Sequence, residues 1–515
     1  MEVIFIALFS VATAVALVAR RLKVPYTVAL VAAGLSLGAA QVFRPPHLTK
    51  ELLYAVFLPG LVFEAAFSIE FKKFWQNKIA VFSLAIPGLV IAIALTTFLL
   101  VPVANSLHFV DNFSLAHGFV FAALIAATDP IAVVALFKSL GAPKRLAVLI
   151  EGESLLNDGT AVVVFTIVLG AVTGGTFSAA DAGLDFARIV GVGALIGAAV
   201  GFALSWVIHQ VDDPMIEITL TTIAAYGSFV AAEHFHFSGV IATVVAGMIS
   251  GNHAARTGMS PSTRVAVATF WEYLAFALNS IVFLLIGFEV RISALLAAWK
   301  PIVVAYLAMT LGRAIVLHLV ALVLLPTREK LPRAWPPVLT WGGLRGGLSM
   351  VLALALPESL PHRELIVAMT FGVVILSIIV QGLTMGPLLR RLGLIGAAET
   401  RIEHERLRGS IKGTRAAIAE VDRMQREGTL ARDMADEMRA EHEARIDAAE
   451  KEMSELHVQA ESLREETRLA AHRRALLAEK DAIVAANRRG EVGEAAYTKL
   501  LADVDARLTE LGGEH

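Results

Sequence analysis

The feature that most constrains this chain is a series of long apolar segments that fills residues 1–395. An α-helix needs roughly 20 apolar residues to cross the hydrocarbon core of a bilayer. Charged residues make up about 11% of residues 1–398 but about 39% of residues 399–515. The pattern predicts a membrane domain over residues 1–395 and a helical cytoplasmic tail over residues 396–515.

Composition excludes several classes of protein. Only 17% of the residues are charged, which is too few to cover the surface of a soluble enzyme of 515 residues. A net charge of −2 gives no signature of nucleic-acid binding. The chain has no cysteine, so disulfides, thiol catalysis and cysteine-based zinc sites are excluded. We expect no cofactor and no nucleic-acid partner, and membrane lipid as the surroundings.

The apolar segments predict an all-α membrane protein with about 13 transmembrane helices. They cover residues 3–18, 26–43, 51–70, 77–103, 114–137, 146–172, 185–209, 214–236, 237–252, 265–289, 292–325, 334–356 and 364–389. Positive charges follow the first segment rather than precede it, which is the reverse of a signal peptide. The first segment is therefore predicted to be a retained helix with its N-terminus outside.

Basic residues between the segments support this orientation. Sixteen lie at predicted inside loops and six at predicted outside ends, as the positive-inside rule requires. The inside set is Arg20, Arg21, Lys23, Lys72, Lys73, Lys78, Lys138, Lys144, Arg145, Arg256, Arg264, Arg328, Lys330, Arg333, Arg390 and Arg391. The outside set is Arg44, Lys50, Arg188, Arg291, Lys300 and Arg363. With an outside N-terminus, an odd number of helices places the tail in the cytoplasm. The expected location is the cell (inner) membrane.

Charges within the predicted helices mark candidate functional residues. Burying a charge at the bilayer centre costs at least ~2.5–3.5 kcal/mol, so such residues are functional by default. The set is Glu64, Asp129, Glu151, Glu153, Asp158, Glu233, Glu272, Arg313 and Arg345.

The first motif with its own chemistry is Thr128-Asp129-Pro130 in the fifth segment. Proline disfavours helix at the residue before it and lacks an N–H, so the helix is predicted to break here. Freed backbone groups would then face a cavity, as in transporters with discontinuous helices. Asp129 would neutralise the positive end of the second half-helix. The alternative is a simple proline kink with an aspartate cap.

The second motif lies near the start of the sixth segment. Ser154 and Asp158 are one helical turn apart on the same face, and Glu153 and Asn157 form the neighbouring pair. Two acids, an amide and a hydroxyl on one turn supply the oxygen ligands that hard cations such as Na⁺ prefer. The alternative is a solvated helix start, against which the apolar residues around the motif argue.

The third motif is the glycine-rich run around Arg345 in the twelfth segment. Four glycines weaken a helix and allow close backbone approach, so a second discontinuous helix is predicted. An arginine cannot deprotonate and needs an acceptor, and Glu153 is the predicted ion-pair partner of Arg345. The alternative is small-residue helix packing with an arginine at the membrane interface.

The two breaks lie in the fifth and twelfth segments, which run in opposite directions. An inverted-topology repeat requires this arrangement, with two crossing discontinuous helices at the midplane. An ion site is then expected beside the sixth segment, although no residue-level repeat is visible between the halves.

These motifs resemble a known family: the monovalent cation/proton antiporters of the sodium/proton exchanger branch, bacterial NhaP type. The matching segments are spread in order over most of the membrane part. The combination of the Glu-Ser-x-x-Asn-Asp element with Thr-Asp-Pro is the most specific. The segments are Phe57–Ala66 (FLPGLVFEAA), Ala127–Val134 (ATDPIAVV), Glu153–Ala161 (ESLLNDGTA), Ala232–Gly239 (AEHFHFSG) and Gly342–Gly347 (GGLRGG).

The resemblance implies 13 helices, a homodimer and an elevator-like movement of a core domain. It implies that Asp158 binds either Na⁺ or H⁺. Thr128, Asp129 and Ser154 would be further Na⁺ contributors, and Glu153 and Asn157 would lie beside the site with Glu153 paired to Arg345. Arg313 matches a basic position of structural type, and Glu64 matches an acidic position near an ion access funnel. The Asn157-Asp158 pair resembles the electroneutral branch.

The predicted function is therefore electroneutral Na⁺/H⁺ antiport by alternating access, with the two cations competing at Asp158. A K⁺/H⁺ antiporter stays open, because cavity size rather than ligand type separates K⁺ from Na⁺, and Li⁺ is a further possible cargo. A cation channel gated by the tail is the alternative from another class. In each case the protein is a transporter and not an enzyme.

The tail is predicted to be helical, with breaks near Gly428 and near residues 490–493. It carries charges of both signs at helical spacing and a sparse apolar stripe of Ile446, Met453, Leu456, Leu463 and Leu469. We expect a regulatory tail that packs on the membrane domain, pairs across a dimer or binds a regulator. The alternative is a solvated appendage without function.

Overall fold

A computed structural model describes residues 2–22, 25–40, 53–107, 113–174, 178–289, 292–395, 397–459, 461–488 and 491–512. Every regular element in these ranges is a helix, as the apolar segments predict. The chain forms two compact units, Met1–Leu392 and Gly393–His515. The division falls close to the predicted boundary at residues 395 and 396.

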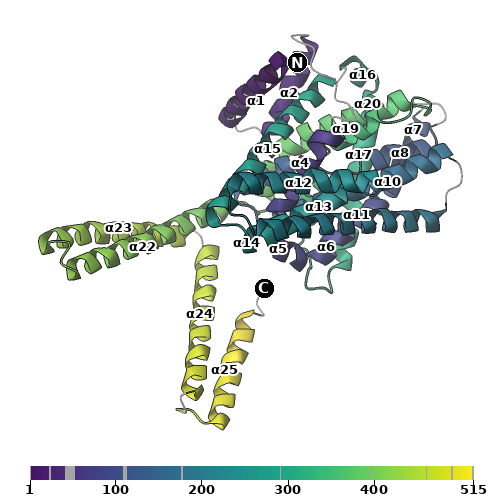
Figure 1. Ribbon diagram of the computed structural model, residues 1–515. Helices are drawn as coiled ribbons and strands as arrows, with labels where there is room; N and C mark the ends of the chain where they lie inside the picture. The colour runs from purple at the N-terminus through teal and green to yellow at the C-terminus, as the bar shows by residue number, and fades with distance from the viewer. Residues whose placement is uncertain are drawn as a thin grey trace. The chain divides into compact units, whose positions relative to one another are not determined.

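The first unit is a bundle of helices (Figure 1). Its N-terminal half contains α1 (Glu2–Leu22), α2 (Tyr26–Ala39), η1 (Leu53–Phe57), α4 (Leu58–Ser68), α5 (Phe71–Gln76), α6 (Lys78–Ser83), η2 (Leu84–Gly88), α7 (Leu89–Ser106), α8 (Leu115–Leu124), α9 (Ile131–Leu140) and α10 (Lys144–Gly174). Its second half contains α11 (Ala179–Ile208), α12 (Pro214–His234), α13 (Gly239–Ile249), η3 (Ser250–Ala254), α14 (Ala255–Thr257), α15 (Pro261–Glu289), α16 (Ile292–Ala297), α17 (Trp299–Val323), α18 (Trp335–Trp341), α19 (Gly347–Leu354), α20 (Arg363–Leu376), η4 (Ser377–Gln381) and α21 (Gly382–Arg391).

Seven helices in the described ranges are long and apolar enough to cross a membrane. They coincide with the fourth, sixth, seventh, eighth, tenth, eleventh and thirteenth predicted segments. Shorter apolar helices account for the first, second and third segments and for the first half of the fifth. A multi-pass membrane protein follows, and the total of 13 stays a prediction.

The two predicted helix breaks are present. Residues 125–130 separate α8 from α9, and residues 342–346 separate α18 from α19. The breaks touch each other, because the backbone N–H of Asp129 donates to the carbonyl oxygen of Leu344 at 2.8 Å. Backbone groups that lose their helical partners at one break therefore find partners at the other.

Contacts between loops join residues that are predicted to lie on the same side of the membrane. Arg145 joins three predicted inside loops, since it donates to Asn77 Oδ1 at 2.7 Å and to the carbonyl oxygen of Glu329 at 2.9 Å. At the predicted outside ends, the ring centres of His117 and His362 are 4.9 Å apart. Lys23, Arg44, Lys50 and Arg291 lie outside the described residues.

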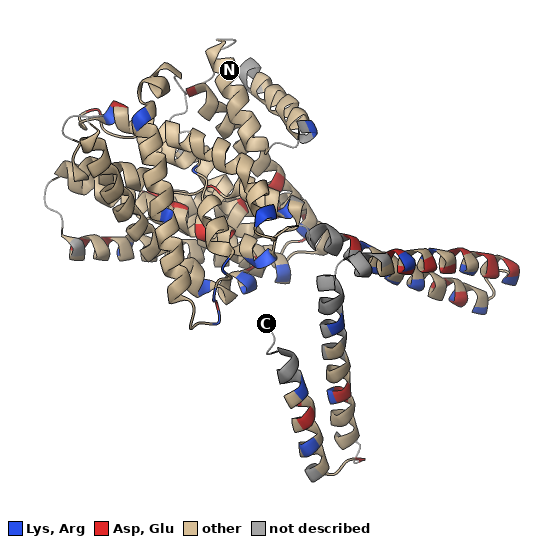
Figure 2. Cartoon of the chain, turned by 180° about the vertical axis from the view of Figure 1, so that it is seen from behind, with Lys and Arg blue, Asp and Glu red and all other residues tan. Residues whose placement is uncertain are grey.

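The second unit consists of α22 (Ala397–Arg426), α23 (Arg432–Gln459), α24 (Glu461–Arg488) and α25 (Glu494–Gly512). The two predicted breaks are present, and Gly428 has the positive φ of 74° that glycine adopts most easily. Charged residues line these helices, whereas the first unit is mostly uncharged (Figure 2).

A small apolar core joins α22 to α23. Leu407, Ile411 and Ala449 are buried in it, and Ile446 and Met453 of the predicted stripe pack against them. The side chains of Leu456, Leu463 and Leu469 lie outside the described residues. The first part of the stripe therefore serves packing within the tail itself.

Candidate functional site

The acidic turn of α10 presents its residues to two different spaces. Ser154 and Asp158 line a cavity of about 570 Å³. Glu153 and Asn157 line a small space of about 30 Å³ on the neighbouring face of the helix. The helical spacing predicts this division into two pairs.

The larger cavity is walled by α4, the α8–α9 break, α9, α10, α15 and the start of α19. Lys138 is the single basic residue among those that line it, and it approaches Glu151 with an Nζ–Oε1 distance of 3.9 Å. A cleft with this excess of negative charge raises the local concentration of cations. The six carboxylates along its walls are those of Glu64, Glu70, Asp129, Glu151, Asp158 and Glu272.

The α8–α9 break lies against Ser154 at this cavity. The Ser154 hydroxyl donates to the carbonyl oxygen of Thr128, and the two side-chain hydroxyls are 3.4 Å apart. Asp129 Oδ1 accepts from the backbone N–H of Ile131 at 3.0 Å. The carboxylate thus lies at the N-terminus of α9 and opposes the positive end of its dipole, as predicted. Thr128, Asp129, Ser154 and Asp158 all line the same cavity.

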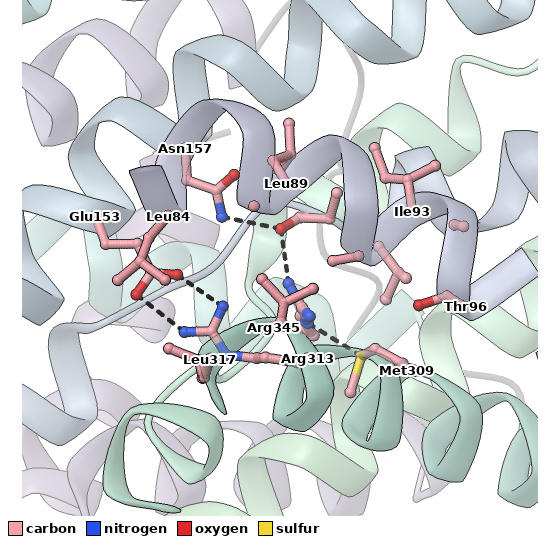
Figure 3. A pocket seen from close by; sticks show the side chains of 16 residues that line it. Leu84, Leu89, Ile93, Thr96, Glu153, Asn157, Met309, Arg313, Leu317 and Arg345 are labelled. Carbon is pink, nitrogen blue, oxygen red and sulfur yellow. Dashed lines mark hydrogen bonds and ion pairs between the residues drawn. The ribbon is translucent and has the colours of Figure 1, made fainter. Parts of the chain in front are cut away.

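The predicted ion pair between Glu153 and Arg345 is wrong, because Arg313 of α17 occupies that position (Figure 3). Arg313 forms a two-pronged pair with Glu153, with N–O distances of 2.7 and 3.1 Å. It also donates to the carbonyl oxygen of Leu339. Glu153 is 3% exposed, so its charge needs this partner.

Arg345 binds backbone oxygens instead of a carboxylate. Its Nη1 donates to the carbonyl oxygens of Ala126 at 2.7 Å and Ala127 at 3.2 Å, and its Nε approaches the sulfur of Met309 at 3.0 Å. These carbonyls follow the C-terminal end of α8, where the helix dipole is negative. The guanidinium therefore caps a half-helix, which explains why a buried arginine is stable without a carboxylate.

Asn157 reaches the same carbonyl from the other side (Figure 3). Its Nδ2 donates to the carbonyl oxygen of Ala126 and to Thr128 Oγ1, each at 3.0 Å. Asn157 lines the small space and not the larger cavity, and its amide therefore positions Thr128 from the side opposite that cavity.

Two glycines of the twelfth segment permit the close contacts at the crossing. A Cβ on Gly346 would lie 2.7 Å from Asp129 Cβ, and one on Gly343 would lie 2.3 Å from Arg313 Nε. Real Cβ atoms do not approach so closely, so a larger residue at either position would displace Asp129 or the Arg313 side chain. The glycines thus set the positions of one acid of the cavity and of the partner of Glu153.

Comparison with known proteins identifies the family of this chain. Residues 5–391 match the family described as "Sodium/hydrogen exchanger, transmembrane". The Na⁺/H⁺ antiporter ApNhaP of Aphanothece halophytica is 40% identical over 75% of this chain and 73% of its own length. The Na⁺/H⁺ antiporter NhaS2 of Synechocystis sp. is 34% identical over 98% of this chain and 93% of its own length.

A solved structure shares the fold. The sodium proton antiporter MjNhaP1 of Methanocaldococcus jannaschii superimposes with a TM-score of 0.59 at 20% identity. The match covers 75% of this chain and 97% of that one. From the family match, the sequence relatives and the motifs assembled around α10, the chain belongs to the sodium/hydrogen exchanger family.

Proposed function

We propose that this protein is a Na⁺/H⁺ antiporter that exchanges one sodium ion for one proton across the cell membrane. The observation that carries the proposal is the placement of Asp158 and Ser154 on one face of α10, in a cavity shared with Thr128 and Asp129. The relatives that are named Na⁺/H⁺ antiporters support sodium as the cargo.

In this proposal Asp158 is the residue at which Na⁺ and the proton replace each other. Its carboxylate binds either a proton or Na⁺, and the hydroxyls of Ser154 and Thr128 and the carboxylate of Asp129 supply further oxygens. Hard monovalent cations prefer oxygen ligands of this kind. The excess of carboxylates along the cavity draws cations towards the site, and Glu64 belongs to this access path.

The fixed charges around the site favour electroneutral exchange. The Glu153–Arg313 pair is neutral as a unit, and Arg345 is held by backbone carbonyls whichever ion is bound. Neither group gains or loses a charge when Asp158 exchanges a proton for Na⁺. The loaded site then carries the same charge in both halves of the cycle, so membrane voltage does not drive the exchange.

Alternating access completes the proposed cycle. The cavity extends to Glu70, at the end of the third predicted segment, and to Lys138 of a predicted inside loop, which supports assigning this arrangement to a state open to the cytoplasm. An elevator-like shift of the α8–α9 and α18–α19 half-helices with α10 would carry the site to the other side. In this proposal the protein has 13 helices with inverted repeats, forms a homodimer and has an outside N-terminus and a cytoplasmic regulatory tail.

Asp158→Asn in proteoliposomes tests the function. We expect the variant to lose Na⁺-dependent proton flux completely, because an amide does not titrate in this pH range and carries no negative charge to balance that of the cation. Asp185→Asn on the exposed face of α11 is the matched control and should transport normally. Retained exchange in Asp158→Asn would exclude the proposed role. Parallel assays with K⁺ and Li⁺ determine the selectivity.

A further inference from the structure

A buried acid far along the sequence from the exchange site has no hydrogen-bond partner among the residues that the structure describes. Glu217 lies in the first turn of α12 and is 0% exposed. Both of its carboxylate oxygens are buried without a hydrogen-bond partner among the described residues. It does not line the exchange cavity.

Glu217 lies in the seam between α12 and α15. Thr263 of α15 donates to Asp212 Oδ1 at 3.4 Å, and Trp271 of α15 donates to Thr221 Oγ1 at 3.1 Å. Helical spacing places Glu217 about one turn before Thr221 on α12, and it places Val267 one turn after Thr263 and one turn before Trp271 on α15. Val267 is 0% exposed and belongs to the apolar cluster that also contains Ala224 and Ala225 of α12 and Trp271 of α15.

Within the described ranges, no basic side chain pairs with Glu217. Asp213 caps α12 by accepting from the backbone N–H groups of Met215 and Ile216. His209 uses its two ring nitrogens on the Ser205 carbonyl oxygen and on Thr257, and Arg264 Nε donates to the carbonyl oxygen of Ala255. The titratable and charged groups of the segments that surround this end of α12 are Glu64, His209, Asp212, Asp213, His253, Arg256 and Arg264. None of them forms a hydrogen bond or ion pair with Glu217 in the part of the chain that the structure describes.

An ionised carboxylate in such a seam is far less stable than a neutral one, because desolvation has no compensating partner. The exposed residues Asp212 and Asp213 add like charge just before the first turn of α12. We propose that Glu217 is a second proton-binding site, independent of Asp158, and that loss of its proton opens the α12–α15 seam.

The chain's lack of cysteine makes a direct test possible. Val267→Cys places one thiol in the seam, and a small thiol reagent applied between about pH 5.5 and about pH 9 reports whether the seam opens. Val267→Cys/Glu217→Gln carries the same thiol beside a neutral side chain, so the ratio of the two labelling rates removes the thiol's own pH dependence.

We expect the labelling rate of Val267→Cys, divided by that of Val267→Cys/Glu217→Gln, to be near one at acid pH and to rise several-fold at alkaline pH. Val267→Cys/Glu217→Leu should behave like the glutamine variant, because both side chains are uncharged. Val267→Cys/Asp185→Asn, which removes an exposed acid, should behave like the single variant. A ratio that stays near one at every pH overturns the proposal.

A further variant separates this site from the exchange site. Val267→Cys/Asp158→Asn should keep the full pH-dependent rise in labelling, because Glu217 acts without transport. Loss of the rise in that background would overturn the independence of the two sites. The result does not depend on whether the exchange function itself is correct.

Discussion

The partner of Glu153 illustrates how burial selects contacts at the scale of single residues. Two arginines lie near this carboxylate. Arg313 forms the ion pair, because α17 places its guanidinium against the face of α10 that carries Glu153. Arg345 is satisfied by the carbonyls of the α8–α9 break instead. A guanidinium requires acceptors in the correct plane, and backbone oxygens at a helix C-terminus provide them.

Breaking the Glu153–Arg313 pair should destabilise the protein strongly. We expect Glu153→Gln and Arg313→Gln each to cost about 3–5 kcal/mol, because each leaves the other charge buried and unpaired. The double variant should cost much less than the sum. Thermal unfolding of the four proteins in detergent gives the coupling energy.

The same cycle with Arg345 in place of Arg313 is the control. Glu153→Gln and Arg345→Gln should give nearly additive losses, since the two side chains form no ion pair. A large coupling energy between Glu153 and Arg345 would contradict the arrangement described here.

Gly346→Ala should disturb the cavity through Asp129. The added methyl would lie 2.7 Å from Asp129 Cβ, so the carboxylate must move away from the N-terminus of α9. We expect a loss of about 1–3 kcal/mol in stability and a larger loss in exchange rate. Gly386→Ala is the control, because its nearest contacts lie at 4.0 Å. Equal exchange rates in the two variants would contradict the prediction.

At the scale of elements, the α8 half-helix depends on its arginine cap. Arg345→Met removes the donor from the carbonyls of Ala126 and Ala127, at a cost of about 1–3 kcal/mol for each unsatisfied group. Arg345→Lys keeps the charge but lacks the planar fork, so we expect an intermediate melting temperature and exchange rate. Arg328→Met, at an exposed position, should change neither. A methionine variant as stable as the lysine variant would exclude the capping role.

The helices and their breaks could be predicted from the sequence better than the side-chain contacts between helices. Pro130 and the glycines around Arg345 act on their own backbone, so both breaks are visible locally. The Ser154–Asp158 face follows from helical spacing alone. The partner of Glu153 depends instead on which helix packs behind α10, and no local signal separates Arg313 from Arg345. Glu217 was missed because it lies near the start of a predicted helix, where an acid is normally solvated.

At the scale of the whole molecule, the tail forms a unit of its own. If it regulates exchange, deletion of residues 399–515 should leave transport intact but shift its dependence on pH. Flux measurements on truncated and full-length protein, matched for the amount reconstituted, test this expectation. Superimposable pH profiles would favour a tail without a regulatory role.

Competition at Asp158 predicts a specific effect of pH on the complete transporter. In the proposed cycle proton and sodium exclude each other at this carboxylate, so lower pH should raise the Na⁺ concentration needed for half-maximal exchange. The rise approaches about tenfold per pH unit once the proton dominates the site. The maximal rate at saturating Na⁺ should stay nearly constant. A falling maximal rate with unchanged half-saturation would contradict competition.

The most direct test of the account is to measure Na⁺ and H⁺ fluxes in the same proteoliposomes at several clamped membrane voltages. One exchanging carboxylate, with every other buried charge held constant, predicts equal and opposite fluxes that do not change with voltage. Unequal fluxes, or an exchange that reverses with voltage, would contradict one-for-one exchange at Asp158.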